Sequence, residues 1–153
     1  MAAFRLPRLH RLNGADWLLL AEALPTLAWA SLAIAFLPFR RVAAAASLPR
    51  RAPSEDRRTT PRKIAWAVDA WARRVPWRAV CFQRGLAVHR MLRRRGYASI
   101  LHYGVAQDMP KGLSAHVWVN LDGKAVIGGE EAPKFACLAV FPPEKDGVAG
   151  PTG

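Results

Sequence analysis

The chain has 153 residues, of which 52% are hydrophobic and 22% are charged. This length fits one domain with or without an appendage, and the apolar content excludes general disorder because it can bury a core. The formal net charge is +12, and 19 of the 23 Lys and Arg residues lie at or before Arg95, against 5 of the 11 acids. The basic part of the chain suits nucleic acid, anionic lipid or an acidic peptide as a partner, or else forms a solvated surface.

The two cysteines, Cys81 and Cys137, form no CxxC pair, which argues against a structural zinc site. We expect free thiols in a reducing compartment rather than a disulfide. Cys137 lies in an apolar run and is predicted to be buried in the core. The N-terminus shows no secretory signal, since the apolar run that begins at Trp17 is long and lacks a clean cleavage site. We therefore expect a cytoplasmic protein.

Residues 17–37 form a strongly apolar run that is long enough to span a bilayer. Glu22, Pro25 and the many alanines favour instead a kinked helix that packs on the rest of the chain. Residues 47–58 are polar and contain prolines, which is typical of a linker.

The change in composition after this stretch divides the chain into three parts. Residues 1–58 are predicted to be an N-terminal helical segment with its linker. Residues 59–142 are predicted to be the main domain, and residues 143–153 a flexible tail.

Two helices are predicted at the start of the main domain. Thr60 is a capping residue for the first helix, with Pro61 at the first helical position. Apolar residues at spacings of three and four give this helix a core-facing stripe, formed by Ile64, Val68, Trp71 and Val75. The second helix begins at Cys81, after Pro76 has ended the preceding segment, and Gly96 provides its left-handed stop.

After this second helix, runs of residues typical of β-strands predict an antiparallel sheet. The predicted segments are Tyr97–Val105, Ala115–Asn120, Lys124–Ile127 and, as a strand or a short helix followed by a strand, Phe135–Phe141. The pair Asp122-Gly123 indicates a tight hairpin turn. Helices followed by antiparallel strands predict an α+β fold, with the helices packed on one face of a small antiparallel sheet.

A cysteine at the start of a helix and a histidine on the sheet are the candidate catalytic pair. Helical periodicity places Cys81 on the inward face with Gly85, at the helix N-terminus, where the partial positive charge favours a thiolate. A thiolate needs a base, and His116 opens the predicted strand. This arrangement indicates nucleophilic catalysis by a thiol enzyme.

A third group is expected to orient the imidazole. Asp122 is near in sequence, but six residues of strand put the hairpin tip roughly 20 Å away. The end of the return strand faces the histidine, and a three-residue loop would place Glu130 diagonally within reach. Glu130 is therefore the predicted third residue, with Glu131 and Asn120 as alternatives. A bulge at the two glycines before it would present Glu131 or a backbone carbonyl instead.

Several motifs taken together resemble a known family. The chain resembles the lasso-peptide leader peptidases, which are transglutaminase-like cysteine proteases that mature ribosomally made peptides. The match covers about residues 61–141, and the apolar helix before it is also similar to the family's N-terminal segment. The motifs are Trp77-Arg78-x-x-Cys81-x-x-x-Gly-Leu-Ala, Leu92-Arg-Arg-Arg-Gly96, Gly104-Val105, and Ala115-His116-Val-Trp118-Val-x-x-Asp122-Gly123.

The resemblance implies a transglutaminase-like or papain-like core, with Cys81 as the nucleophile and His116 as the base. The family's acid lies about a dozen residues beyond the histidine, and that place is occupied here by Gly128, which is a departure. This is a second reason to consider Glu130. The chemistry needs no cofactor, neither a metal nor a nucleotide.

The resemblance also implies partners. The substrate would be a lasso precursor peptide, and a cyclase similar to asparagine synthetase would act in the same pathway. Residues 1–60 are too short and too helical to be a fused leader-recognition domain, so we expect a separate recognition protein. We expect neither nucleic-acid binding nor membrane association.

Two alternatives to a peptidase remain open. A non-catalytic basic adaptor that binds nucleic acid or an acidic partner would also explain the net charge, although the aromatic residues follow the core-facing stripes rather than the arginines. A transglutaminase or acyltransferase would use the same cysteine and histidine, with an amine in place of water.

Overall fold

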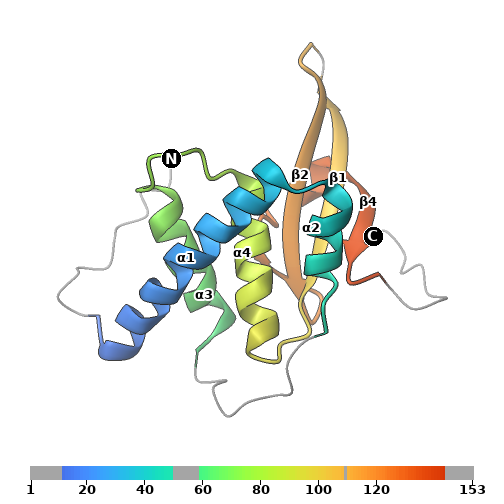
Figure 1. Cartoon of the computed structure of the whole chain (residues 1–153). Helices are drawn as coiled ribbons and strands as arrows, with labels where there is room; N and C mark the ends of the chain where they lie inside the picture. The colour runs from blue at the N-terminus through green and yellow to red at the C-terminus, as the bar shows by residue number, and fades with distance from the viewer. Residues whose placement is uncertain (1–11, 50–58, 109, 144–153) are drawn as a thin grey trace.

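The computed structural model describes residues 12–49, 59–108 and 110–143 (Figure 1). Its helices are α1 (Gly14–Phe36), α2 (Phe39–Ala46), α3 (Pro61–Ala72), α4 (Cys81–Arg94) and the short 3-10 helix η2 (Ala132–Lys134). Its strands are β1 (Ile100–Asp108), β2 (Gly112–Leu121), β3 (Lys124–Ile127) and β4 (Ala136–Phe141). The four strands form one antiparallel sheet in the order β3-β2-β1-β4. The predicted α+β class is confirmed.

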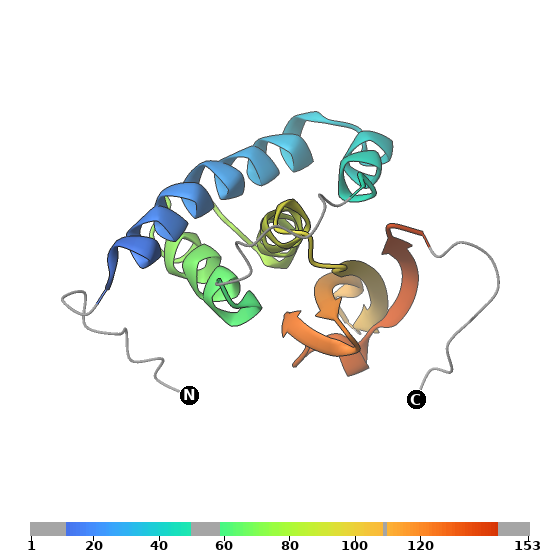
Figure 2. The same cartoon turned by 90° about the horizontal axis from the view of Figure 1, so that it is seen from below.

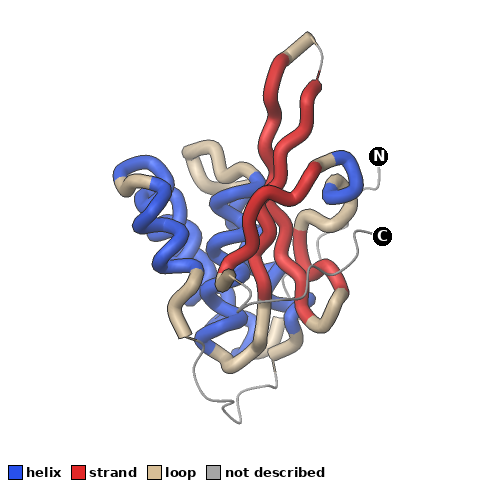
Figure 3. Tube along the Cα trace, turned by 90° about the vertical axis from the view of Figure 1, so that its right-hand side faces the viewer, coloured by secondary structure: helices blue, strands red, loops and turns tan. Residues whose placement is uncertain are grey.

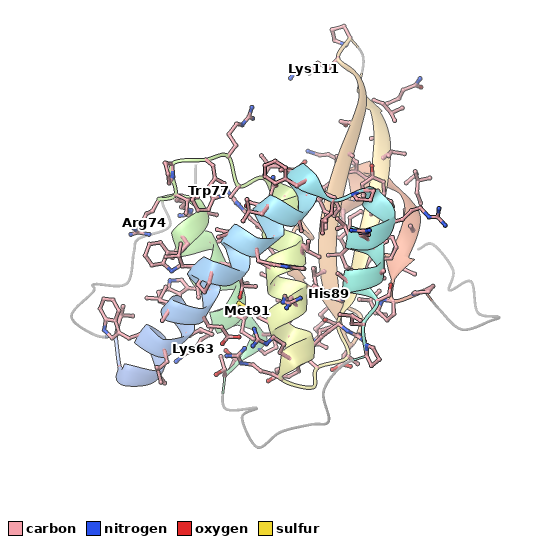
Figure 4. The ribbon with its side chains drawn as sticks, in the orientation of Figure 1. Lys63, Arg74, Trp77, His89, Met91 and Lys111 are labelled. Atoms are coloured by element: carbon pink, nitrogen blue, oxygen red, sulfur yellow. The ribbon has the colours of Figure 1, made fainter. Side chains whose placement is uncertain are left out.

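The helices cover one face of the sheet, as Figure 2 shows. The core between the two layers contains large side chains from both, among them Leu27, Ile64, Leu86, Met91, Leu92, Leu101, Val117 and Val119. Since side chains alternate along a strand, Val117 and Val119 of β2 face the helices, whereas His116 and Trp118 project from the other side. The β1–β2 hairpin extends past the rest of the sheet (Figure 3) and carries Lys111 at its tip (Figure 4).

Local signals explain where α3 and α4 begin and end. The Thr60 hydroxyl accepts a hydrogen bond from the backbone N–H of Lys63 at 3.3 Å, as expected for a capping residue. Helix α4 ends at Gly96, whose φ of 82° is the left-handed conformation that glycine adopts without strain. The N–H of Tyr97 then donates to the carbonyl of Leu92 at 3.1 Å, which completes a Schellman motif.

Helix α1 packs along α3 and α4, and its buried residues belong to the same core as theirs. The Glu22 carboxylate of α1 accepts a 2.9 Å hydrogen bond from Arg95, and the Trp71 indole N–H donates to the carbonyl of Leu20 at 2.9 Å. Pro25 lies inside α1 without ending the helix. By length and composition alone, α1 is also the one helix of the described residues that could cross a membrane.

The predicted division into three parts stays a prediction. The boundary between residues 58 and 59 and most of the predicted linker fall in residues 50–58, and the tail from residue 144 onward is likewise outside the described residues. Where the chain is described, α1 and α2 contribute to the same hydrophobic core as α3 and α4.

The β2–β3 hairpin differs from the register predicted from the sequence. Asp122 and Gly123 have φ values of 51° and 78°, which makes a two-residue turn. The ladder then shifts by one residue between Asn120 and Val119, because β3 contains a bulge. The three-residue loop used to predict Glu130 is therefore wrong, and the bulge determines what reaches the histidine.

Candidate active site

Cys81 is the first residue of α4 and is half-buried. The backbone N–H of Val80 donates to the Gln83 side-chain oxygen at 3.1 Å, which stabilises the start of the helix. The N–H groups of a first helical turn have no acceptors within the helix, and together they create a partial positive charge. The Cys81 thiol therefore lies beside backbone N–H groups that could donate to an oxyanion.

The segment that leads to Cys81 is attached to the helical layer by polar side chains. The Trp77 indole N–H donates to the Ser31 hydroxyl of α1 at 2.9 Å (Trp77 is labelled in Figure 4). Arg84 donates to the carbonyl of Ala79 at 2.9 Å and forms an ion pair with Asp69 at 3.5 Å. Burial raises the pKa of Asp69, and the positive charge of Arg84 opposes that rise. These contacts hold the beginning of α4 in a fixed position.

A glycine brings α4 close to the strand that carries the histidine. A Cβ on Gly85, one turn after Cys81, would lie 2.6 Å from Cγ1 of Val117. Only a residue without a side chain allows this separation, so Gly85 sets the distance between α4 and β2. Val117 is the direct neighbour of His116, and the two candidate catalytic residues thus belong to elements that pack together.

The His116 ring lies in an aromatic stack and is 9% exposed. Its centroid is 5.0 Å from that of Phe135 and 6.1 Å from that of Trp118. Nε2 is 2.8 Å from the carbonyl oxygen of Gly128. A carbonyl only accepts hydrogen bonds, so Nε2 carries the hydrogen and Nδ1 of the neutral ring keeps its lone pair. The structure therefore leaves Nδ1 as the basic atom.

Gly128 is the position at which the resemblance places the family's acid. Its φ is 77°, and a Cβ there would lie 2.6 Å from the carbonyl oxygen of Val117. A side chain at this position would be strained and would collide with β2. The chain instead presents the backbone carbonyl of the same residue to the imidazole. The bulge itself lies in β3 between Ala125 and Ile127, not at the two glycines considered from the sequence.

None of the predicted acids forms a hydrogen bond to the His116 ring in the described structure. Glu130 is exposed in the turn that follows β3, and Asp122 is exposed at the hairpin tip. Glu131 is exposed and pairs with Lys134 at 2.9 Å, which lowers its pKa, with a smaller contribution from the nearby histidine. Asn120 is half-buried on β2. Glu130 stays a prediction for the third residue.

Among the described residues, no hydrogen bond joins the Cys81 thiol to the His116 ring. Val117 occupies the side of β2 that contacts α4, and the imidazole projects from the opposite side. Strand β3 pairs with β2 only as far as Val119, and beyond that point the turn at Gly128 lies against the carbonyl of Val117. Their pairing as nucleophile and base stays a prediction.

Two features near this site did not follow from the sequence. Phe135, on the connection before β4, stacks on the His116 imidazole. The two residues are far apart in sequence, so no local pattern indicates this contact. Cys137 was predicted to be buried but is exposed, with its sulfur 3.7 Å from Nδ1 of His102. The prediction was wrong because β4 is an edge strand, whose apolar composition resembles that of a core strand.

Comparison with protein families gives one match, to the model described as transglutaminase-like superfamily, over residues 23–140. The chain therefore belongs to the transglutaminase-like superfamily, whose members are generally cysteine-type enzymes. The match includes most of α1, in agreement with the core that α1 shares with α3 and α4. Comparisons with curated proteins and with solved structures give no significant match.

Proposed function

We propose that this protein is a cysteine peptidase that removes the leader peptide from a lasso-peptide precursor. The observation that carries the proposal is the position of Cys81 at the start of a helix packed on the strand of His116, in a chain of the transglutaminase-like superfamily. The resemblance of the motifs around both residues to lasso leader peptidases supplies the substrate.

The proposed reaction begins with proton transfer from the Cys81 thiol to Nδ1 of His116. The thiolate attacks the scissile carbonyl, and the N–H of Cys81 at the helix start donates to the oxyanion that forms. The imidazolium gives its proton to the leaving amine as the carbon–nitrogen bond breaks. Water, deprotonated by the same nitrogen, then releases the acyl group and restores the thiol.

Two further groups support the base in this mechanism. The carbonyl of Gly128 holds the ring orientation and its tautomer through the 2.8 Å hydrogen bond to Nε2. Glu130, two residues further along the same turn, is the proposed acid and would act on the imidazolium through its charge. The reaction further requires the thiol and Nδ1 to come into hydrogen-bond contact.

The remaining parts of the proposal concern the surroundings of the enzyme. A separate leader-recognition protein would present the precursor, and a cyclase similar to asparagine synthetase would use the product. The reaction would take place in the cytoplasm. These partners follow from the resemblance.

The test is cleavage of a lasso precursor by the purified protein together with the recognition protein. Cys81→Ala should abolish cleavage and leave the circular dichroism spectrum unchanged, because the thiol is the nucleophile and contributes little to the core. Cys137→Ser is the matched control and should cleave normally. Cleavage by Cys81→Ala would refute the proposal.

A primary amine added to the assay separates hydrolysis from acyl transfer. A transglutaminase would incorporate the amine into the product, since the amine replaces water on the acyl-enzyme. Hydrolysis that persists at high amine concentration, without incorporation, is expected of the peptidase.

A further inference from the structure

A pocket of about 250 Å³ lies between α1, α2 and α4, away from the candidate active site. Part of its lining is apolar and comes from Trp29, Ala45, Ala46, Leu48 and Leu86. The rest includes three arginines of α4, Arg90, Arg93 and Arg94. Figure 4 shows His89 on α4 beside α2, where it also lines the pocket. No Asp or Glu is among the described residues that line it.

The arginines of α4 differ in their partners. Arg84 and Arg95 form ion pairs with acids of α3 and α1. Arg93 donates to the carbonyl of Leu48 at 2.9 and 3.0 Å. In the described part of the chain, neither Arg90 nor Arg94 forms an ion pair. The two residues are four apart on the helix and are therefore neighbours on its surface. Two neighbouring cations thus share the pocket with no carboxylate from the part of the chain that the structure describes.

Arg90 is half-buried and lies between an aromatic ring and a second cation. Its guanidinium lies 4.1 Å from the centre of the Trp29 ring, which fixes its position by a cation–π contact. Burial lowers the pKa of Arg90, and the positive charge of Arg94 lowers it further. A carboxylate between the two arginines would remove this repulsion and form charge-assisted hydrogen bonds.

We propose that this pocket binds an acidic polypeptide segment, with a carboxylate held by Arg90 and Arg94 and an adjacent apolar side chain seated on the part of the lining formed by Ala45 and Leu86. A nucleic acid fits less well, because base recognition without sequence preference needs an open aromatic face. Arg90 covers the face of Trp29. A pocket that is partly apolar and carries two adjacent cations matches a peptide with alternating acidic and apolar residues.

The pocket lies apart from the proposed chemistry. Arg90 and Arg94 follow Cys81 by nine and thirteen residues on the same helix, which corresponds to roughly 14 and 20 Å along its axis. The inference goes beyond the proposed peptidase, since binding at the pocket needs neither Cys81 nor His116. A bound segment would be attached to the rigid helix whose first residue is the thiol.

The test measures binding of a fluorescein-labelled peptide of alternating Leu and Glu by fluorescence anisotropy. The Cys81→Ala protein is used so that no cleavage interferes. A double variant, Arg90→Gln with Arg94→Gln, should weaken binding about tenfold or more, because it removes two charge-assisted contacts. The control pair Arg62→Gln with Arg74→Gln, which also removes two positive charges but at exposed positions, should weaken it less than about twofold. The corresponding Leu and Gln peptide should not bind.

Three results would overturn the proposal. One is equal binding by the double variant, and another is an equal loss in the control pair Arg62→Gln with Arg74→Gln, which would indicate attraction by the net charge alone. The third is that the double variant weakens the binding of an oligothymidylate but not the binding of the acidic peptide. If the double variant fails to fold by circular dichroism, Arg94→Gln alone decides the matter, since this side chain is exposed and its loss should weaken binding about threefold or more.

Discussion

Two buried histidines in this molecule have opposite environments. His89, at the contact of α4 with α2, is 1% exposed and uses both ring nitrogens. Nε2 donates to the carbonyl of Ala46 at 2.7 Å, and Nδ1 accepts from the Ser99 hydroxyl at 2.9 Å. His116, at the end of the β2–β3 hairpin, is bonded to a carbonyl through Nε2 alone.

The comparison shows that two buried histidines of one fold can differ in their capacity to take up a proton in a reaction. Burial lowers the pKa of His89 to about 4, so this ring stays neutral near pH 7 and acts as a structural hydrogen-bonding group. His116 has its ring position and tautomer fixed, yet it keeps a basic nitrogen for a reaction. The number of engaged ring nitrogens therefore distinguishes the structural from the candidate catalytic histidine better than burial does.

The largest effect should come from His116. His116→Ala should reduce leader cleavage by a factor of about a thousand or more, as expected for a member of a catalytic unit. In a Cys137→Ser background, the alkylation of Cys81 by iodoacetamide near neutral pH should also slow markedly. An unchanged alkylation rate would show that the ring does not act on Cys81.

His89→Ala should have the opposite result. The change creates a cavity and leaves the carbonyl of Ala46 and the hydroxyl of Ser99 without their partner, which should cost about 4 kcal/mol of unfolding free energy. Urea unfolding measures this loss. Cleavage at a temperature where the variant is folded should stay within about twofold of the wild type. A stable variant with no activity would reverse the roles assigned to the two histidines.

The pKa of His89 predicts a specific pH dependence of stability. Between pH 6.5 and about 4, the unfolded chain binds a proton at this position that the folded chain excludes. The free energy of unfolding should therefore fall as the pH is lowered through this window, by about 3 kcal/mol in total, and this contribution should be constant above it. Urea unfolding at pH 5.5 and pH 7 tests this, with His89→Gln as the variant in which the slope should flatten.

The smallest effect concerns the third catalytic residue. Because the carbonyl of Gly128 already orients the ring, Glu130→Gln should slow cleavage only about tenfold, through the lost charge near the imidazolium. Asp122→Asn, at the far tip of the hairpin, should leave the rate within about twofold. Cleavage rates of the two variants, measured side by side, test this prediction. A severe defect in Asp122→Asn alone would assign the acid to Asp122 in the β2–β3 turn.

The elements predicted correctly from sequence are those with local signals. Thr60 and Pro61 mark the start of α3, and Gly96 marks the end of α4, because capping depends on residues within one turn. Asp122 and Gly123 mark the hairpin because few residues accept two consecutive positive φ values. Periodicity also identifies the α+β class, which depends only on the order of the elements.

The features that sequence reasoning missed depend on contacts between distant segments. The bulge in β3 leaves no mark in residues 124–127, and it invalidates the register from which Glu130 was placed. Phe135 contacts His116 because the connection after β3 brings it back to the His116 ring. The exposure of Cys137 follows from the place of β4 at the edge of the sheet, which composition does not reveal.

The hydrogen bond from His116 to the carbonyl of Gly128 also affects how the chain responds to random substitution. A backbone carbonyl is present whatever residue the codon specifies, so no single replacement deletes this acceptor. A deep mutational scan should nevertheless tolerate little besides glycine at position 128, since any side chain meets Val117. Asp and Ala should be depleted alike at position 128, because side-chain size and the backbone angle determine what is accepted there. A position occupied by an acid that orients a histidine would instead accept Glu or Asn better than Ala.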